Sequence, residues 1–127
     1  MVRRDAPSRG WRALTPQRGD LCFGSFPASE SGEPLTKRLL VVSCQAINQA
    51  GMHAIVARLT VKGRDRSVPT AVEVEPTAEN SLPRLTYVLC HDLVTISQDS
   101  LEQFGRLGIV DLVRVEEGLR YALSLPR

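Results

Sequence analysis

Short apolar runs, separated by polar segments that contain glycine and proline, recur along the chain. Runs of this length that are rich in leucine, valine and isoleucine are typical of buried β-strands. They predict six strands, at residues 21–26, 38–44, 53–60, 70–75, 85–90 and 93–96. Within 70–75, small or apolar residues alternate with acids, which indicates a strand with only one buried face. The polar segments 45–51 and 61–69 are predicted to be loops.

The last part of the chain changes from short runs to helical spacing. Between residues 109 and 124, apolar side chains recur every three or four positions, at Ile109, Leu112, Val115, Leu119 and Ala122. This period predicts an amphipathic helix that packs one face on the strands. Several antiparallel strands followed by one helix indicate a single α+β domain, mostly β, which fits a length of 127 residues.

Positive charge is concentrated at the start of the chain. Residues 1–13 hold four arginines against one aspartate, a net charge of +3, which leaves −1 for the rest of a chain whose total is +2. A near-neutral body is not typical of a protein that coats nucleic acid, but it allows a small cationic site that binds a few phosphates. We expect residues 1–17 to be a basic, flexible N-terminal arm and residues 18–127 to form the domain. Trp11 in that arm could stack on RNA bases, or dock on its own domain or a partner subunit.

The cysteines show no metal-binding or disulfide pattern. Cys22, Cys44 and Cys90 are far apart in the sequence, without a CxxC pair or a histidine at zinc-ligand spacing. They are expected to be buried, reduced thiols of a cytoplasmic protein that needs no metal and no cofactor. No segment has the apolar length that a signal peptide or a membrane span requires, so we expect no membrane association.

A pair of cations marks the main candidate site. Lys37 and Arg38 follow the loop-like segment 27–36, which is rich in proline, serine and threonine, and lead directly into the apolar run 39–44. Such junctions often hold binding groups, because the strand fixes their position while the loop leaves them open to ligand. A second basic group, in the predicted loop 61–69, comprises Lys62, Arg64 and Arg66. This second group is either part of a binding site or a solvated loop tip.

Several short motifs occur in an order that resembles one protein family. Arg18-Gly19-Asp20 precedes the first predicted strand, Gly32-Glu33-Pro34 lies in the loop before Lys37-Arg38, and the third predicted strand ends at Thr60. In this order and spacing they resemble the MazF/PemK family, the ribosome-independent endoribonuclease toxins of bacterial toxin-antitoxin systems. The chain departs from the family at Leu39, where a proline is usual, and at His91-Asp92, where an acid and a glutamine are usual.

The resemblance implies a fold, a reaction and partners. The fold is a small SH3-like antiparallel barrel (CcdB/MazF-like) with a C-terminal amphipathic helix, assembled as a homodimer. The reaction is sequence-specific, metal-independent cleavage of single-stranded RNA to 2′,3′-cyclic phosphate and 5′-hydroxyl ends. The partner is a MazE-like antitoxin with an acidic, disordered segment, which the cations would attract as readily as they attract RNA.

The resemblance also implies roles for particular residues. Arg38 and Thr60 are the catalytic candidates, Glu33 is a possible orienting group, and the RNA-binding cations are Lys37, Lys62, Arg64 and Arg66. A guanidinium can donate two hydrogen bonds to a phosphate and stays charged at neutral pH, so Arg38 suits charge stabilisation better than proton abstraction. The hydroxyl of Thr60 can donate to the same phosphate.

Two other interpretations stay open. One is a non-enzymatic, CcdB-like inhibitor of DNA gyrase on the same barrel, and the other is a catalytically inactive paralogue that binds only the antitoxin. The chain ends in Ser124-Leu125-Pro126-Arg127, without the aromatic C-terminal end through which CcdB-like toxins act, which favours the nuclease. His53 and His91 fall outside the positions that the family uses for chemistry, so both are interpreted as structural.

Overall fold

The computed structural model describes residues 15–26, 35–63 and 67–126. Most of the expected N-terminal arm 1–17, together with Glu33, Arg64 and Arg66, lies outside these residues, so what the sequence implies for them stays a prediction. Within the described ranges, no helix is long and apolar enough to cross a membrane.

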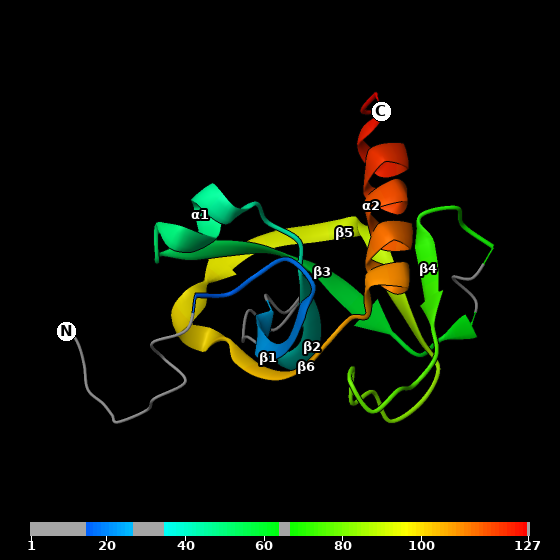
Figure 1. The fold of residues 1–127 in the computed structure, drawn as a ribbon, viewed down its shortest axis with the longest axis horizontal. Coiled ribbons are helices and arrows are strands. Elements are labelled where there is room, and N and C mark those ends of the chain that lie inside the picture. The colour runs from blue at the N-terminus through cyan, green and yellow to red at the C-terminus, as the bar shows by residue number, and fades with distance from the viewer. Residues whose placement is uncertain (1–14, 27–34, 64–66, 127) are drawn as a thin grey trace.

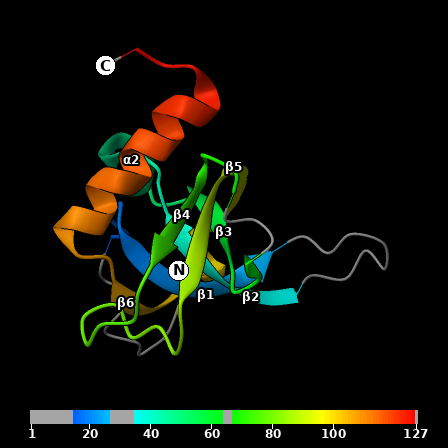
Figure 2. The ribbon, with the colours of Figure 1, turned by 90° about the vertical axis from the view of Figure 1, so that its right-hand side faces the viewer.

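Six antiparallel strands form one sheet that curls into part of a barrel, with one long helix packed on it (Figure 1). The strands are β1 (Asp20–Phe26), β2 (Leu35–Val41), β3 (His53–Thr60), β4 (Ala71–Val74), β5 (Thr86–Ser97) and β6 (Glu102–Arg106), in the order β4-β5-β3-β2-β1-β6. The helical elements are α1 (Gln45–Gln49), the short 3₁₀ helix η3 (Gln98–Ser100) and α2 (Ile109–Leu123). Figures 1 and 2 both show α2 beside β4 and β5. The mostly β fold with a C-terminal helix that the sequence predicts is confirmed.

The long strand β5 bends in its middle. It pairs with β3 on both sides of the bend, with Ala57 opposite Leu93 but the next residue, Arg58, opposite Leu89. The residues of β5 between these partners have no counterpart on β3, and extra residues of this kind bend a strand. The prediction of two separate strands at 85–90 and 93–96 is therefore wrong. The two segments belong to one strand, because β5 pairs with β3 again after the polar interruption.

Backbone pairing also creates elements that the apolar pattern does not predict. β6 has a single large apolar side chain, yet it forms the edge of the sheet because its backbone pairs with β1. The second strand is shifted to 35–41 from the predicted 38–44, because its exposed first residues pair with β1. The segment 45–51, predicted as a loop, contains α1, which is too short and polar to show a helical period.

Apolar side chains fill both sides of the curled sheet. One core cluster includes Leu40 and Leu59 and is covered by α2, whose Val115 is fully buried. The other includes Leu39 and Val41. We call these the α2 side and the far side of the sheet. Consecutive residues such as Leu39 and Leu40 fall on different sides because successive side chains of a strand point in opposite directions.

Two side chains that were expected to be buried are exposed. Ile109, the first residue of α2, is 73% exposed. The remaining positions of the predicted stripe do face the core, and Gly118 joins them, since a Cβ there would lie only 2.8 Å from the Cys90 sulfur. Cys44 precedes α1 and is exposed, whereas Cys22 and Cys90 are buried as predicted.

Candidate functional site

Arg38 belongs to a small aromatic site built by three adjacent strands. It lies on β2, directly opposite Phe23 of β1, and Phe104 comes from β6 on the other edge of β1. The guanidinium carbon of Arg38 lies 5.3 Å from the ring centroid of Phe23 and 5.8 Å from that of Phe104. The two rings contact each other with 4.7 Å between their centroids. Both cation distances lie within the range in which a cation is attracted to an aromatic face.

Arg38 differs from most arginines of the described chain in what holds it. Five others pair with carboxylates: Arg18 with Glu116, Arg58 with Asp92, Arg106 with Asp20, Arg114 with Asp111 and Arg120 with Glu117. The Arg38 side chain is exposed and makes no hydrogen bond or ion pair with any other described residue. No described residue occupies its N–H donors, and a planar, permanently charged fork suits a phosphate.

Thr60, the other predicted catalytic residue, ends β3 and projects from the far side of the sheet. Its neighbour Leu59 packs on the α2 side, so alternation along the strand directs Thr60 away from α2. Arg38 projects from the α2 side, as Leu40 does two residues later. The structure shows no contact between Arg38 and Thr60, and their action on one phosphate stays a prediction.

Lys37, unlike Arg38, projects from the same side of the sheet as Thr60. The paired register of β2 and β3 ends with Leu39 opposite Arg58. Lys37 and Thr60 each lie two residues beyond this pair, so both project from the far side at the open end of the two strands. The exposed Lys37 side chain and the Thr60 hydroxyl therefore lie on the same side of the sheet, where they can share a ligand.

Lys62 is the one cation of the predicted RNA-binding loop that the structure describes. Its backbone N–H donates a hydrogen bond of 3.2 Å to the Thr60 hydroxyl oxygen, and its side chain is exposed. A hydroxyl that accepts one bond still has its own hydrogen to donate. Thr60 therefore keeps a donor for a ligand.

The Arg18-Gly19-Asp20 motif has a structural role. Arg18 donates from Nε to the Val42 carbonyl oxygen over 2.9 Å, and its Nη1 lies 3.3 Å from the Glu116 carboxylate, which ties α2 to the end of β2. Asp20 is buried and pairs with Arg106 of β6. The motif therefore anchors β1 to α2 and β6, and its charges are already paired.

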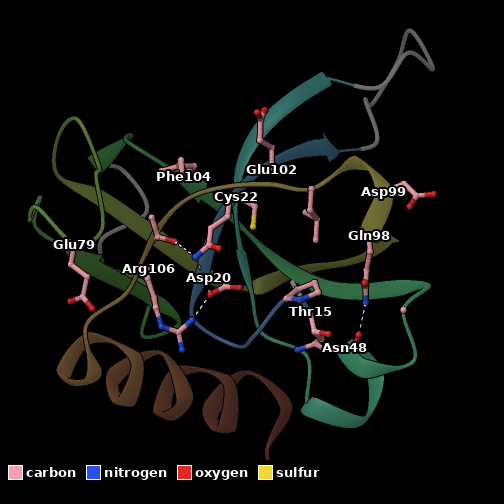
Figure 3. Close-up of a pocket in the computed structure, with 15 residues that line it drawn as sticks. Thr15, Asp20, Cys22, Asn48, Glu79, Gln98, Asp99, Glu102, Phe104 and Arg106 are labelled. Carbon is pink, nitrogen blue, oxygen red and sulfur yellow. Dashed lines mark hydrogen bonds and ion pairs between the residues drawn. The ribbon is translucent and has the colours of Figure 1, made fainter. Parts of the chain in front are cut away.

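A cavity of about 720 Å³ lies beside β6 (Figure 3). Its described lining carries one cation, Arg106, which Figure 3 shows turned towards Asp20, against four carboxylates from Asp20, Glu79, Asp99 and Glu102. Phe104 lines the cavity and also contacts Arg38, so the cavity and the aromatic site share a wall. A mostly negative lining repels a phosphate chain. The exposed cations, and not this cavity, are the candidate phosphate site.

The remaining candidate groups of the sequence have structural contacts or altered acidity. His91 Nδ1 lies 2.6 Å from the Thr70 hydroxyl, and Asp92 accepts a hydrogen bond of 2.6 Å from Arg58, so both residues of the His91-Asp92 departure contact neighbouring segments.

Burial, with a smaller effect of the Asp20 charge, raises the pKa of the Cys22 thiol to about 12, and burial raises the pKa of Cys90 to about 11. A backbone hydrogen bond from Ile47 is the main cause that lowers the pKa of the exposed Cys44 thiol.

Phe23 and Phe104 are site residues that the sequence analysis does not single out. In the sequence, Phe23 is one apolar residue of a predicted strand, and Phe104 stands in a segment without a strand pattern. The register of an antiparallel pair could have placed Phe23 opposite Arg38, but that register depends on the length of the intervening turn. The contact with Phe104 has no local signal, because it depends on the pairing of β6 with β1.

Comparison with known proteins shows the family to which this chain is similar. The model of the family described as PemK-like, MazF-like toxin of type II toxin-antitoxin system matches residues 17–123. An endoribonuclease in complex with its cognate antitoxin, from a mycobacterial species, is 26% identical with a TM-score of 0.72, covering 88% of this chain and 98% of that chain. A second mycobacterial endoribonuclease is 25% identical with a TM-score of 0.67, covering 90% and 96% of the two chains. A chain of a MazE-MazF crystal structure from Deinococcus radiodurans is 21% identical with a TM-score of 0.70, covering 89% and 100%, and shows the similarity of the fold alone. No curated protein sequence matches the chain.

The matched residues 17–123 include every strand and helix described above. The solved structures are in turn covered almost from end to end. The chain therefore belongs to the family of PemK-like, MazF-like toxins of type II toxin-antitoxin systems.

Proposed function

We propose that this toxin is an endoribonuclease that cleaves single-stranded RNA in the cytoplasm, with Arg38 bound to the reacting phosphate. Two similar solved structures, at 26% and 25% identity, are endoribonucleases. The observation on this chain that carries the proposal is the state of Arg38. It is exposed, it lies over two aromatic rings, and its N–H donors are unpaired among the described residues. Such an arginine can bind a phosphate without first giving up an ion pair.

The proposed reaction is an internal transesterification. The ribose 2′-oxygen attacks the adjacent phosphorus and loses its proton, the bond from phosphorus to the 5′-oxygen breaks, and the leaving 5′-oxygen gains a proton. The products are a 2′,3′-cyclic phosphate and a 5′-hydroxyl. Negative charge grows on the phosphoryl oxygens in the transition state, and a fixed cation there stabilises it. Arg38 supplies this charge but does not act as the base, because a guanidinium stays protonated at neutral pH.

Other residues contribute to RNA binding in this proposal. Thr60 donates its hydroxyl hydrogen to the RNA backbone, and Lys37 and Lys62 bind phosphates near it. Because Thr60 and Lys37 project from the far side of the sheet, the bound RNA must reach both sides at the open end of β2 and β3 for Thr60 to act on the phosphate that Arg38 binds. Arg64 and Arg66 extend the cationic surface, and Glu33 orients Arg38 by accepting from one of the five guanidinium N–H donors, which leaves the others for the phosphate.

The proposed partners follow from the same cations. An antitoxin with an acidic, disordered segment would bind the N–H donors of Arg38, which no described residue occupies, and so exclude RNA. We also propose a homodimer, since two-fold symmetric dimers are the commonest oligomers and a shared groove would double its cationic lining. Sedimentation at micromolar concentration tests the dimer, and a strictly monomeric protein contradicts the shared groove.

Cleavage of mixed-sequence single-stranded RNA by the purified protein, with excess EDTA and analysis of the product ends, tests the proposal. Cleavage is expected to survive chelation and to leave cyclic phosphate ends. Arg38→Ala should reduce the rate by roughly 10² or more, the loss expected when a preorganised donor to a developing charge is removed. Arg38→Lys should restore only part of the rate, because an ammonium cannot reproduce the bidentate fork. Thr60→Ala should cost less than Arg38→Ala, since a neutral hydroxyl makes the weaker hydrogen bond.

Arg120→Ala is a matched control for the loss of one arginine. Arg120 lies on α2, and its exposed pair with Glu117 stabilises the protein little. Its rate should equal that of the wild type. If no RNA is cut, with or without divalent metal, the chain acts as a binding toxin or an inactive paralogue. If Arg38→Ala cuts RNA as fast as Arg120→Ala, the reaction has another centre.

A further inference from the structure

We propose that Phe23 and Phe104 are positioning residues that hold the Arg38 guanidinium ready for the reacting phosphate. The proposal rests on the proposed function, because it concerns the same phosphate site. Three adjacent strands build this device: β2 carries the cation, β1 carries the ring opposite it, and β6 carries the second ring. Neither ring contacts the phosphate in this arrangement, since both act through Arg38.

The two rings support each other as well as the cation. Their centroids are 4.7 Å apart with 40° between the ring planes, a tilted geometry that is favourable for aromatic pairs. Phe104 also packs against the α2-side core cluster, and this contact holds the Phe104 ring in place. The cation therefore lies against a preformed surface rather than against mobile side chains.

An aromatic support suits a phosphate-binding arginine better than a carboxylate does. A carboxylate occupies the N–H donors of the guanidinium, as in the Arg58–Asp92 and Arg120–Glu117 pairs, and it repels an incoming phosphate. A ring attracts the cation through its face and takes none of the strong hydrogen-bond donors. The flexible arginine loses part of its rotamer freedom to the rings before RNA arrives, and its fork stays available for the transition state.

Replacing the rings by leucine keeps apolar bulk but removes the aromatic faces. From the usual strength of exposed cation–π contacts, Phe23→Leu or Phe104→Leu should lower kcat about 2- to 5-fold, and the double variant about 5- to 30-fold. KM should change little, because a charge that acts mainly in the transition state affects kcat and kcat/KM together. Phe104→Tyr keeps the ring face and should restore the rate. Tyr121→Leu, which removes an exposed ring on α2, should leave kcat unchanged.

Two further measurements separate positioning from general structural damage. In the Arg38→Ala background Phe104→Leu should have no additional effect on the rate, since the ring then has no cation to hold. In the intact protein, NMR should show the side-chain protons of Arg38 shifted by the ring currents of the two phenylalanines, with the shift reduced in Phe104→Leu. All variants are compared at a temperature at which circular dichroism shows them folded.

The proposal is overturned if the leucine variants keep the wild-type kcat while Arg38→Ala loses activity. It is equally overturned if Phe104→Leu lowers the rate as much in the Arg38→Ala background as in the wild type, or if the Arg38 protons show no ring-current shift. A wild-type protein that cuts no RNA refutes the proposed function instead. In that case the NMR shift still decides whether the rings hold Arg38.

Discussion

Gly105→Ala tests whether the aromatic site depends on a close approach between β6 and the loop that precedes β5. A Cβ at position 105 would lie 2.2 Å from the carbonyl oxygen of Asn80 and 2.7 Å from its carbonyl carbon. No real Cβ approaches backbone atoms so closely, so either β6 or the loop must move. Gly105 follows Phe104 directly, so movement of β6 also changes the support of Arg38.

The loop around Asn80 is held too firmly to give way. Asn80 is almost fully buried, and its side-chain oxygen accepts hydrogen bonds of 2.9 Å from the backbone N–H groups of both Thr77 and Leu82. Its side-chain nitrogen donates to the Glu75 carbonyl oxygen, also over 2.9 Å. Moving this backbone would break several hydrogen bonds of a buried side chain, which is costly to leave without partners. The edge strand β6 is therefore the part that moves.

The expected loss of stability combines two opposing effects. Overpacking by one methyl group costs about 1–3 kcal/mol, and the high end applies because the obstructing atoms belong to the backbone. Removal of a glycine also stabilises by about 0.4–1 kcal/mol, since the unfolded chain loses freedom. The net loss is about 2 kcal/mol, which lowers Tm by roughly 8 °C in a domain of this size.

Thermal unfolding followed by circular dichroism measures this loss, and RNA cleavage at a temperature where the variant is folded measures the effect on the site. Gly63→Ala is the matched control, because a Cβ there lies no closer than 3.9 Å to its nearest neighbour, the Tyr87 hydroxyl. The control should keep or slightly raise Tm. A Gly105→Ala protein as stable and as active as Gly63→Ala would refute the reasoning, because it would show that the approach of β6 to Asn80 is not tight.

Three further outcomes are expected from the buried and exposed groups. A thiol reagent should modify only Cys44 in the native protein and all three cysteines in denaturant. The reaction of Cys44 should begin at lower pH than that of a free cysteine, because the pKa of Cys44 is lowered. Rapid modification of a second thiol in the native protein would contradict the burial of Cys22 and Cys90. Cys22 and Cys90 lose their protons more readily in the unfolded chain, because burial raises their pKa values in the native protein. Their contribution to stability is therefore complete below pH 9 and is lost as the pH rises from 9 towards 12. Cys90→Ala should make Tm fall less steeply over that range. Asp20→Asn should lower the free energy of unfolding, measured in urea, by about 1–3 kcal/mol. This loss is smaller than the loss from breaking a fully buried ion pair, because Arg106 is partly exposed. An unchanged urea midpoint would show that the pair does not hold β1 to β6.

The sequence by itself determines the elements whose signal is local. Apolar runs locate β1 and β3 closely, and the helical period locates α2. The junction before the apolar run marks Arg38 as an exposed cation on a rigid element, and the order of short motifs identifies the family. These features are readable because each depends on residues that are neighbours along the chain.

Tertiary structure alone decides the features that depend on pairing between distant segments. β6 is a strand only because β1 pairs with it, and β5 is continuous only because β3 pairs with both its halves. Thr60 and Arg38 project from opposite sides of the sheet because of the alternation within each strand and the register between strands, neither of which composition reveals. The support of Arg38 by Phe104 joins residues far apart in the sequence, because backbone hydrogen bonds between strands, and not sequence proximity, bring a cation and a ring into contact.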